Sequence, residues 1–371
     1  MFTGVAATLT IPPHIGGCLK PAVDHAQAGR VAQSIECVAA AAVADIQQHQ
    51  QAFLADAAHA RVLCDLYAEL FALAGLKPAA SPHSATPPSG ARPLRVLYLV
   101  SSLVDGQAAS ANIARFCRLH DPSRFVAHVL CVEEFTRRTP TLNFLEYPDS
   151  PSSRVGDKTI ATLPLGSLTL LEPAGDLLAG ARAAIAASRA LAPDVAVFVA
   201  SPACPVQAAC AFARIAPRQV NMNIGVPLPL SGIDEIVYNS PRRWAQDRAF
   251  LTARGIASRS VETSGGDASA GVHARAESRV DLGLPSDALA LVSAGNRLPQ
   301  RLLAGSFVRD LDAFLSSHPH AWWVGVGPGD FAPIRAALGP GLARVITPGP
   351  RADIRPIVKA CDIYLNEYPE G

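Results

Sequence analysis

The chain has 371 residues, enough for two ordinary α/β domains and an extension, because one domain typically occupies about 150 residues. Hydrophobic residues make up 49% of the chain and charged residues 17%, and its net charge is +1, without a long run of lysine or arginine. This balance argues against a broad nucleic-acid surface. No apolar run reaches the roughly 18 residues of a membrane-spanning helix. The first residues also lack a secretory signal pattern, so we expect a cytoplasmic protein, with peripheral membrane contact left open.

The eight cysteines of the sequence form no CxxC pair. Most of them lie within apolar runs, where a free thiol packs as a small hydrophobic side chain. We therefore expect buried, reduced thiols and no bound metal.

Residues 1–76 are rich in Ala, Gln, Leu and His with little glycine, which predicts a helical extension. Residues 77–93 (KPAASPHSATPPSGARP) are dense in Pro, Ser and Ala and are typical of a linker. Because such a linker offers little to a shared core, we expect the rest of the chain to fold without residues 1–89.

Residues 94–270 form the first predicted α/β domain. The continuous apolar run Leu94–Val100 predicts a strand covered on both faces. It is followed by a predicted helix over Ala108–Leu119 and a strand over Phe125–Val132, which together make a βαβ unit. The alternation continues with the helix Leu177–Leu191, the strand Asp194–Ala200, the helix Pro205–Ile215 and the strands Gln219–Asn223 and Glu235–Tyr238. This order indicates a doubly wound parallel sheet.

The same rhythm restarts in residues 271–371, the second predicted domain. We expect strands and helices in strict alternation, at Leu289–Ala294, Leu303–Ser316, Ala321–Val326, Phe331–Leu338, Arg344–Ile346, Ile354–Lys359 and Ile363–Leu365. The sequence stops after a strand and a polar turn, from which an open sheet would normally continue into a helix. We therefore expect this second domain to be incomplete and the chain by itself to be inactive.

Three segments of the second domain resemble, in order, the donor-binding domain of glycosyltransferases with the GT-B fold. They are Arg279–Gln300 (RVDLGLPSDALALVSAGNRLPQ), Ser317–Gly329 (SHPHAWWVGVGPG) and Ala360–Gly371 (ACDIYLNEYPEG). The resemblance implies two Rossmann-like domains, the second binding a nucleotide sugar and the first an acceptor. Two families share this template: the retaining transferases that include sucrose and glycogen synthases, and the protein O-GlcNAc transferases with their bacterial N-glycosylating relatives.

The first domain is more similar to the second of these families. Leu119–Phe125 (LHDPSRF) and Ala216–Val220 (APRQV) resemble its "hD-x-x-R-F" and "AP-x-Q-V" segments. That family has a histidine in the loop after the first strand, whereas the loop Ser101–Gly106 (SSLVDG) has none. This departure leaves the catalytic group open.

Sugar transfer requires the leaving diphosphate to be stabilised, and the resemblance implies that cationic side chains and a helix N-terminus do this without a metal or cofactor. Arg297 and Arg301 are the candidates, since arginine can hold phosphate through two parallel hydrogen bonds. The alternative for each is a solvated surface charge. Arg301 stands where these families usually have lysine. The full predicted donor set is Gly295, Asn296, Arg297, Arg301, Gly349, Glu370 and Gly371.

Asp105, in the loop after the first strand, is the candidate catalytic base, although an Asp-Gly pair there is more often a turn. Gly325, Gly327 and Gly329 lack the full dinucleotide fingerprint, which argues against a dehydrogenase. We expect Trp322 and Trp323 to pack in the core. His318 and His320 are expected to flank a helix rather than bind a metal.

Together these features predict a glycosyltransferase that moves a sugar, most plausibly from a UDP-linked donor, to a protein or glycan acceptor. One alternative is a non-catalytic relative of the same fold that binds a nucleotide sugar or a protein. Another is a sugar-nucleotide epimerase. The donor sugar, the acceptor and the stereochemistry stay open.

Overall fold

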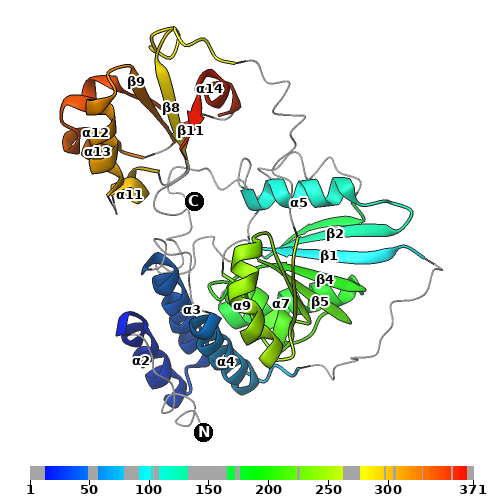
Figure 1. Cartoon of the computed structure of the whole chain (residues 1–371). Coiled ribbons are helices and arrows are strands. Elements are labelled where there is room, and N and C mark those ends of the chain that lie inside the picture. The colour runs from blue at the N-terminus through cyan, green and yellow to red at the C-terminus, as the bar shows by residue number, and fades with distance from the viewer. Residues whose placement is uncertain are drawn as a thin grey trace. The chain divides into compact units, whose positions relative to one another are not determined.

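The computed structural model of the chain contains two compact units, the first made by the described residues up to 261 and the second by those from 276 onward. Each unit is a parallel α/β sheet with helices packed on it (Figure 1). The structure describes residues 13–48, 57–78, 92–101, 103, 108–132, 165–171, 176–223, 226–261, 276–295, 298–303, 306–327, 329–351 and 354–365.

The first unit is built on a seven-stranded sheet with the order β3-β2-β1-β4-β5-β6-β7, in which all neighbouring strands are parallel. The strands are β1 (Leu94–Val100), β2 (Phe125–Cys131), β3 (Ser167–Leu170), β4 (Val195–Val199), β5 (Arg218–Asn223), β6 (Glu235–Tyr238) and β7 (Ala257–Ser260). The chain builds outward from β1 in one direction and then, from β4 on, in the other. The point between β1 and β4 is therefore the topological switch point of this sheet.

Alternating side chains of β1 supply two separate cores. Leu97 and Leu99 join the core on one face, and Val96, Tyr98 and Val100 join the core on the other. This is why β1 has a continuous apolar sequence instead of an alternating one. The helices of the unit are α5 (Ala108–Leu119), α7 (Leu177–Ala190), α8 (Pro205–Phe212) and α9 (Pro241–Ala253).

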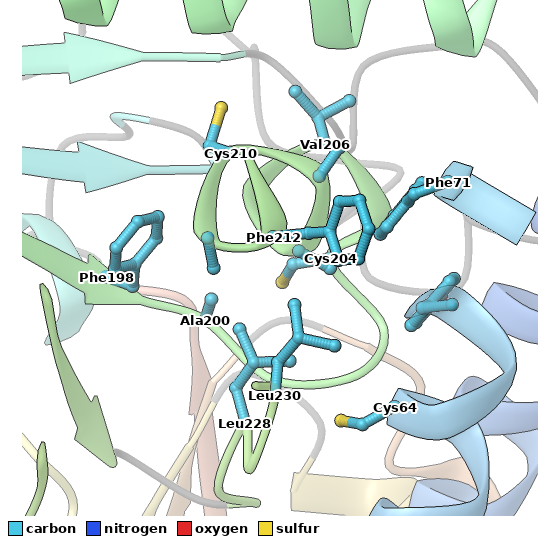
Figure 2. Close-up of a cluster of buried hydrophobic side chains, with 14 of the residues drawn as sticks. Cys64, Phe71, Phe198, Ala200, Cys204, Val206, Cys210, Phe212, Leu228 and Leu230 are labelled. Carbon is cyan, nitrogen blue, oxygen red and sulfur yellow. The ribbon is translucent and has the colours of Figure 1, made fainter. Parts of the chain in front are cut away.

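The N-terminal helices α2 (Pro13–Gln27), α3 (Val31–Gln48) and α4 (Ala57–Leu73) belong to the same unit. Their buried side chains form one continuous core with those of α7, α8 and β4. The ring centroid of Phe71 in α4 lies 5.7 Å from that of Phe212 in α8, and Figure 2 shows the two side by side. This shared core argues against the expectation that the rest of the chain folds without residues 1–89. The composition of a linker gives no information on whether the helices before it dock.

The second unit contains a four-stranded parallel sheet with the order β10-β9-β8-β11. Its strands are β8 (Leu289–Ala294), β9 (Ala321–Val326), β10 (Val345–Gly349) and β11 (Ile363–Tyr364). Its helices are α11 (Leu298–Leu303), α12 (Phe307–Ser317), α13 (Ala332–Ala337), η2 (Pro340–Arg344) and α14 (Arg355–Ala360). The predicted helix Leu303–Ser316 corresponds to α12, which begins four residues later, at Phe307.

The predicted doubly wound α/β class is confirmed, and β1, β6, β8 and β9 have the predicted bounds. Among the described elements of the two units, β3, β7, α9, α11 and η2 were not predicted. The strands β3 and β7 have four residues each, and β7 has exposed and half-buried residues in alternation at the sheet edge. In α9 only Asp247 and Leu251 are buried, so the helix carries no apolar stripe to reveal it.

Candidate functional site

The carboxyl ends of the strands in the second sheet bring three glycines together. Open α/β sheets bind ligands at this edge, at the switch point of strand order, which here lies between β8 and β11. Gly295 follows β8, Gly327 follows β9, and Gly349 ends β10. The Gly295 N–H donates to the Val326 carbonyl at 3.0 Å, and Gly349 pairs with Val326 from the other side.

At Gly327 the main chain approaches the neighbouring strand end too closely for a side chain. A Cβ placed on Gly327 would lie 2.1 Å from the carbonyl oxygen of Gly295, well inside the contact distance. Gly349 has a φ of +79°, a conformation that favours glycine. The three strand ends therefore offer a main-chain surface without side chains, a surface that phosphate groups can approach closely.

Of the predicted donor residues, the structure places Gly295 and Gly349 at this edge, on either side of β9. Arg301 lies in α11, the helix that begins three residues after Gly295, and its side chain is outside the described residues. Asn296, Arg297, Glu370 and Gly371 also lie outside the described residues, as does Asp105.

Sequence reasoning missed Tyr364, which lies at the end of β11 beside the switch point. Its hydroxyl donates to the Ala294 carbonyl at 3.2 Å, one residue before Gly295, and 46% of the residue is exposed. An exposed aromatic ring at this edge can contact a ligand. The sequence signal was available, since Tyr364 lies within the predicted strand Ile363–Leu365.

Other residues of the three resembling segments stabilise the sheet rather than line its ligand edge. Arg279 donates to Asp362 at 2.7 Å and to the Ala360 carbonyl at 2.9 Å. Asp362 in turn accepts the Ala290 N–H at 2.8 Å, at the amino end of β8. This ion pair joins the first and third segments at the edge opposite the glycines. Part of the sequence pattern therefore encodes fold stability.

The predictions for the tryptophan pair and the histidine pair can be compared with the structure at Trp323 and His318. Trp323 is fully buried, as predicted, between Phe307 and Phe331, and its indole N–H donates to Ser293 at 3.1 Å. Gly325 packs against this ring, because a Cβ there would lie 2.6 Å from Trp323. His318 follows the last residue of α12 and its Nδ1 lies 2.9 Å from the Phe314 carbonyl, so its place beside a helix is confirmed.

A second polar cluster lies at the switch point of the first sheet, where β1 and β4 end. Gln207 of α8 is fully buried. In the amide orientation that satisfies both of its ends, its nitrogen donates to the Leu99 carbonyl at 3.1 Å and its oxygen accepts from Ser101. The hydroxyl of Ser101 also lies 3.4 Å from the Cys204 thiol. These contacts hold the end of β1 against the start of α8, shortly before Asp105 in the sequence.

The described cysteines are free thiols, and most are buried, in agreement with their apolar surroundings. Burial raises the pKa of Cys117 to about 11, and burial raises that of Cys361 to about 11 as well. Both thiols therefore stay protonated at neutral pH. Among the helices that the structure describes, none is long and apolar enough to cross a membrane.

Comparison with known proteins gives a likeness in fold. No protein-family model matches the sequence, and no curated protein matches it. The structure is similar to that of a mutant O-GlcNAc transferase from Thermobaculum terrenum, with a TM-score of 0.54 and 15% identity over 96% of this chain. This chain spans 65% of the length of that protein.

A second solved structure, from Listeria monocytogenes and described as a UDP-N-acetylglucosamine 2-epimerase, has a TM-score of 0.45 and 11% identity. The match covers 75% of this chain and 75% of that protein, and its TM-score is too low to support an argument. The first likeness, together with the two parallel sheets, shows the fold. The chain has the two Rossmann-like units of the GT-B architecture.

Proposed function

We propose that the protein is a glycosyltransferase that moves a sugar from a nucleotide donor, UDP-linked, to a protein or glycan acceptor. The observation that carries the proposal is the meeting of Gly295, Gly327 and Gly349 at the ligand edge of the second sheet. The GT-B fold and the similarity in fold to an O-GlcNAc transferase support it. A cytoplasmic location stays a prediction.

On the donor side, the glycine edge would receive the diphosphate, because a main chain without side chains lets the phosphate oxygens approach closely. Arg297 and Arg301 follow Gly295 in the sequence and would neutralise the charge that develops on the leaving group, in place of a metal. Glu370 and Gly371 would contact the sugar, and Asn296 would complete the donor loop. Only the position of the glycines rests on the described geometry.

On the acceptor side, the switch point of the first sheet would receive the nucleophile. Asp105, four residues after Ser101, would take the proton of the acceptor hydroxyl or amide as general base. The bond between the sugar anomeric carbon and the diphosphate oxygen breaks, a bond from that carbon to the acceptor forms, and the nucleoside diphosphate leaves. An Asp105→Asn variant should therefore lose turnover while it keeps donor affinity.

Calorimetric titration of UDP into the full chain tests the donor site. Arg297→Ala should weaken UDP binding by about 1–3 kcal/mol, the usual range for losing a charge-assisted hydrogen bond. Arg309→Ala is the matched control, because this arginine of the same unit is 79% exposed and pairs with Asp310. Equal UDP affinity in wild type and in Arg297→Ala would remove the site assignment.

Turnover assays separate the proposed function from its alternatives. A glycosyltransferase releases UDP from UDP-hexose or UDP-N-acetylhexosamine in the presence of candidate peptides or glycans. An epimerase interconverts the free donor without any acceptor. Because this chain by itself is expected to be inactive, both assays are also run on the coding sequence read to its natural stop codon. Binding of UDP with neither reaction in both forms would identify a non-catalytic relative.

A further inference from the structure

Besides its apolar contacts with the core of the first unit, helix α4 makes a buried hydrogen bond through the hydroxyl of Tyr67. Tyr67 is fully buried, and its hydroxyl donates to the carbonyl of Pro202 at 2.7 Å, across 135 positions in the sequence. The ring itself is stacked on Phe71, with centroids 5.4 Å apart and an interplanar angle of 4°. The ring therefore packs within α4, whereas the hydroxyl bonds the main chain that follows β4.

The residue that accepts this hydrogen bond lies in the turn between β4 and α8. Within that turn the Cys204 N–H donates to the Ser201 carbonyl at 2.9 Å, and the Ala203 N–H donates to the Ser201 hydroxyl at 3.3 Å. Figure 2 shows Cys204 beside the α8 segment that carries Phe212, with Phe71 of α4 next to it. The turn thus lies between α4 and the carboxyl end of β4.

The same turn also contacts the end of β1. Cys204 and Gln207 both contact Ser101, as described above. A shift of the turn would therefore move Ser101, the first residue after β1. Tyr67 bonds Pro202 in the same turn, and this hydrogen bond limits such a shift.

We propose that Tyr67 is a positioning residue, which fixes the β4–α8 turn and through it the end of β1 on the acceptor side of the site. The N-terminal helices would then set the geometry of the acceptor side as well as cover the core. This inference rests on the proposed function for its catalytic consequence. The structural coupling itself stands on the Tyr67, Pro202 and Ser101 contacts.

Tyr67→Phe is the decisive variant, because it removes the hydroxyl and keeps the ring and its stack. Phe71→Leu is the matched control, since Phe71 packs on Phe212 and makes no hydrogen bond to the turn. Hydrogen exchange of residues 201–208 in the full chain is measured for both. We expect Tyr67→Phe to raise exchange in this turn by about tenfold, the equivalent of one lost hydrogen bond. Phe71→Leu should raise exchange evenly along α4 and α8.

Activity supplies the second readout. With a UDP-sugar as donor, Tyr67→Phe should lower kcat by about tenfold or more, as small misplacements of catalytic groups do, with donor KM and UDP affinity unchanged. If Tyr67 contributes only to stability, Tyr67→Phe should show the same exchange pattern and the same kinetics as Phe71→Leu. That result would overturn the proposal. If the wild type shows no turnover, as expected for this chain by itself, the exchange of the turn alone decides whether Tyr67 fixes it. Unchanged exchange in Tyr67→Phe refutes the coupling.

Discussion

Gly327→Ala is the sharpest test of the glycine edge. The new Cβ would lie 2.1 Å from the Gly295 carbonyl oxygen and 3.2 Å from its carbonyl carbon. Ordinary contacts of this kind exceed 3.4 Å, so the turn after β8 must move by more than 1 Å or tilt its carbonyl. The displaced group is main chain and cannot rotate away as the end of a side chain could.

Two consequences of this substitution can be measured. Stability should fall by about 1–3 kcal/mol, the usual cost of overpacking a buried site. The turn after β8 leads into the segment that contains Arg297 and Arg301, so UDP affinity should fall as well, by about 1–3 kcal/mol if one charge-assisted hydrogen bond is lost. Urea denaturation and calorimetric titration of UDP give the two quantities.

Gly283→Ala is the matched control in the same unit. Gly283 has a φ of +77°, but a Cβ there would meet only Ile346, at 4.0 Å. This variant carries backbone strain of about 1–2 kcal/mol without a clash at the strand ends. We expect it to lose stability and keep UDP affinity. If Gly327→Ala binds UDP as the wild type does while its stability falls, the glycine edge does not hold the donor and the reasoning is refuted.

Two further predictions concern pH. Burial acts to raise the pKa of Asp194, but hydrogen bonds from the Arg92 side chain at 2.7 and 2.8 Å and from the Arg95 N–H at 2.8 Å outweigh it and lower that pKa. Asp194→Asn should therefore cost about 1 kcal/mol at pH 7. This cost should begin to shrink once the pH falls below about 3.9, where the unfolded chain binds a proton at this carboxylate, and should vanish only below the lowered pKa of folded Asp194. A cost that stays constant in urea melts from pH 7 to the most acidic pH at which the chain folds would contradict this. Burial, and then the charge of Arg95, lowers the pKa of His128, whose Nε2 is buried without a hydrogen-bond partner. The unfolded chain then binds a proton below about pH 6.5 that the folded chain binds only at lower pH, so stability should fall from pH 7 to pH 5, and His128→Gln should flatten that slope; an unchanged slope would show that His128 does not carry it.

Much of the fold could be predicted because its strands are buried on both faces. The runs at β1, β8 and β9 are continuously apolar, and their bounds follow from where the apolar residues stop. The predictions failed where burial is partial, as in the edge strand β7, or where the buried face of a helix is small, as in α9. In both cases the local pattern of apolar and polar residues does not differ enough from that of a loop to predict a strand or a helix.

The sequence by itself determined the order of strands and helices and the positions of the glycines at two strand ends, Gly295 and Gly349. Only the tertiary structure decided that Gly327 meets Gly295, that Arg279 pairs with Asp362, and that α4 reaches Pro202 through Tyr67. Local patterns report whether a residue is buried, since burial repeats with the period of its own helix or strand. They carry no information on the partner, because these contacts join residues from 32 to 135 positions apart and depend on which strands become neighbours.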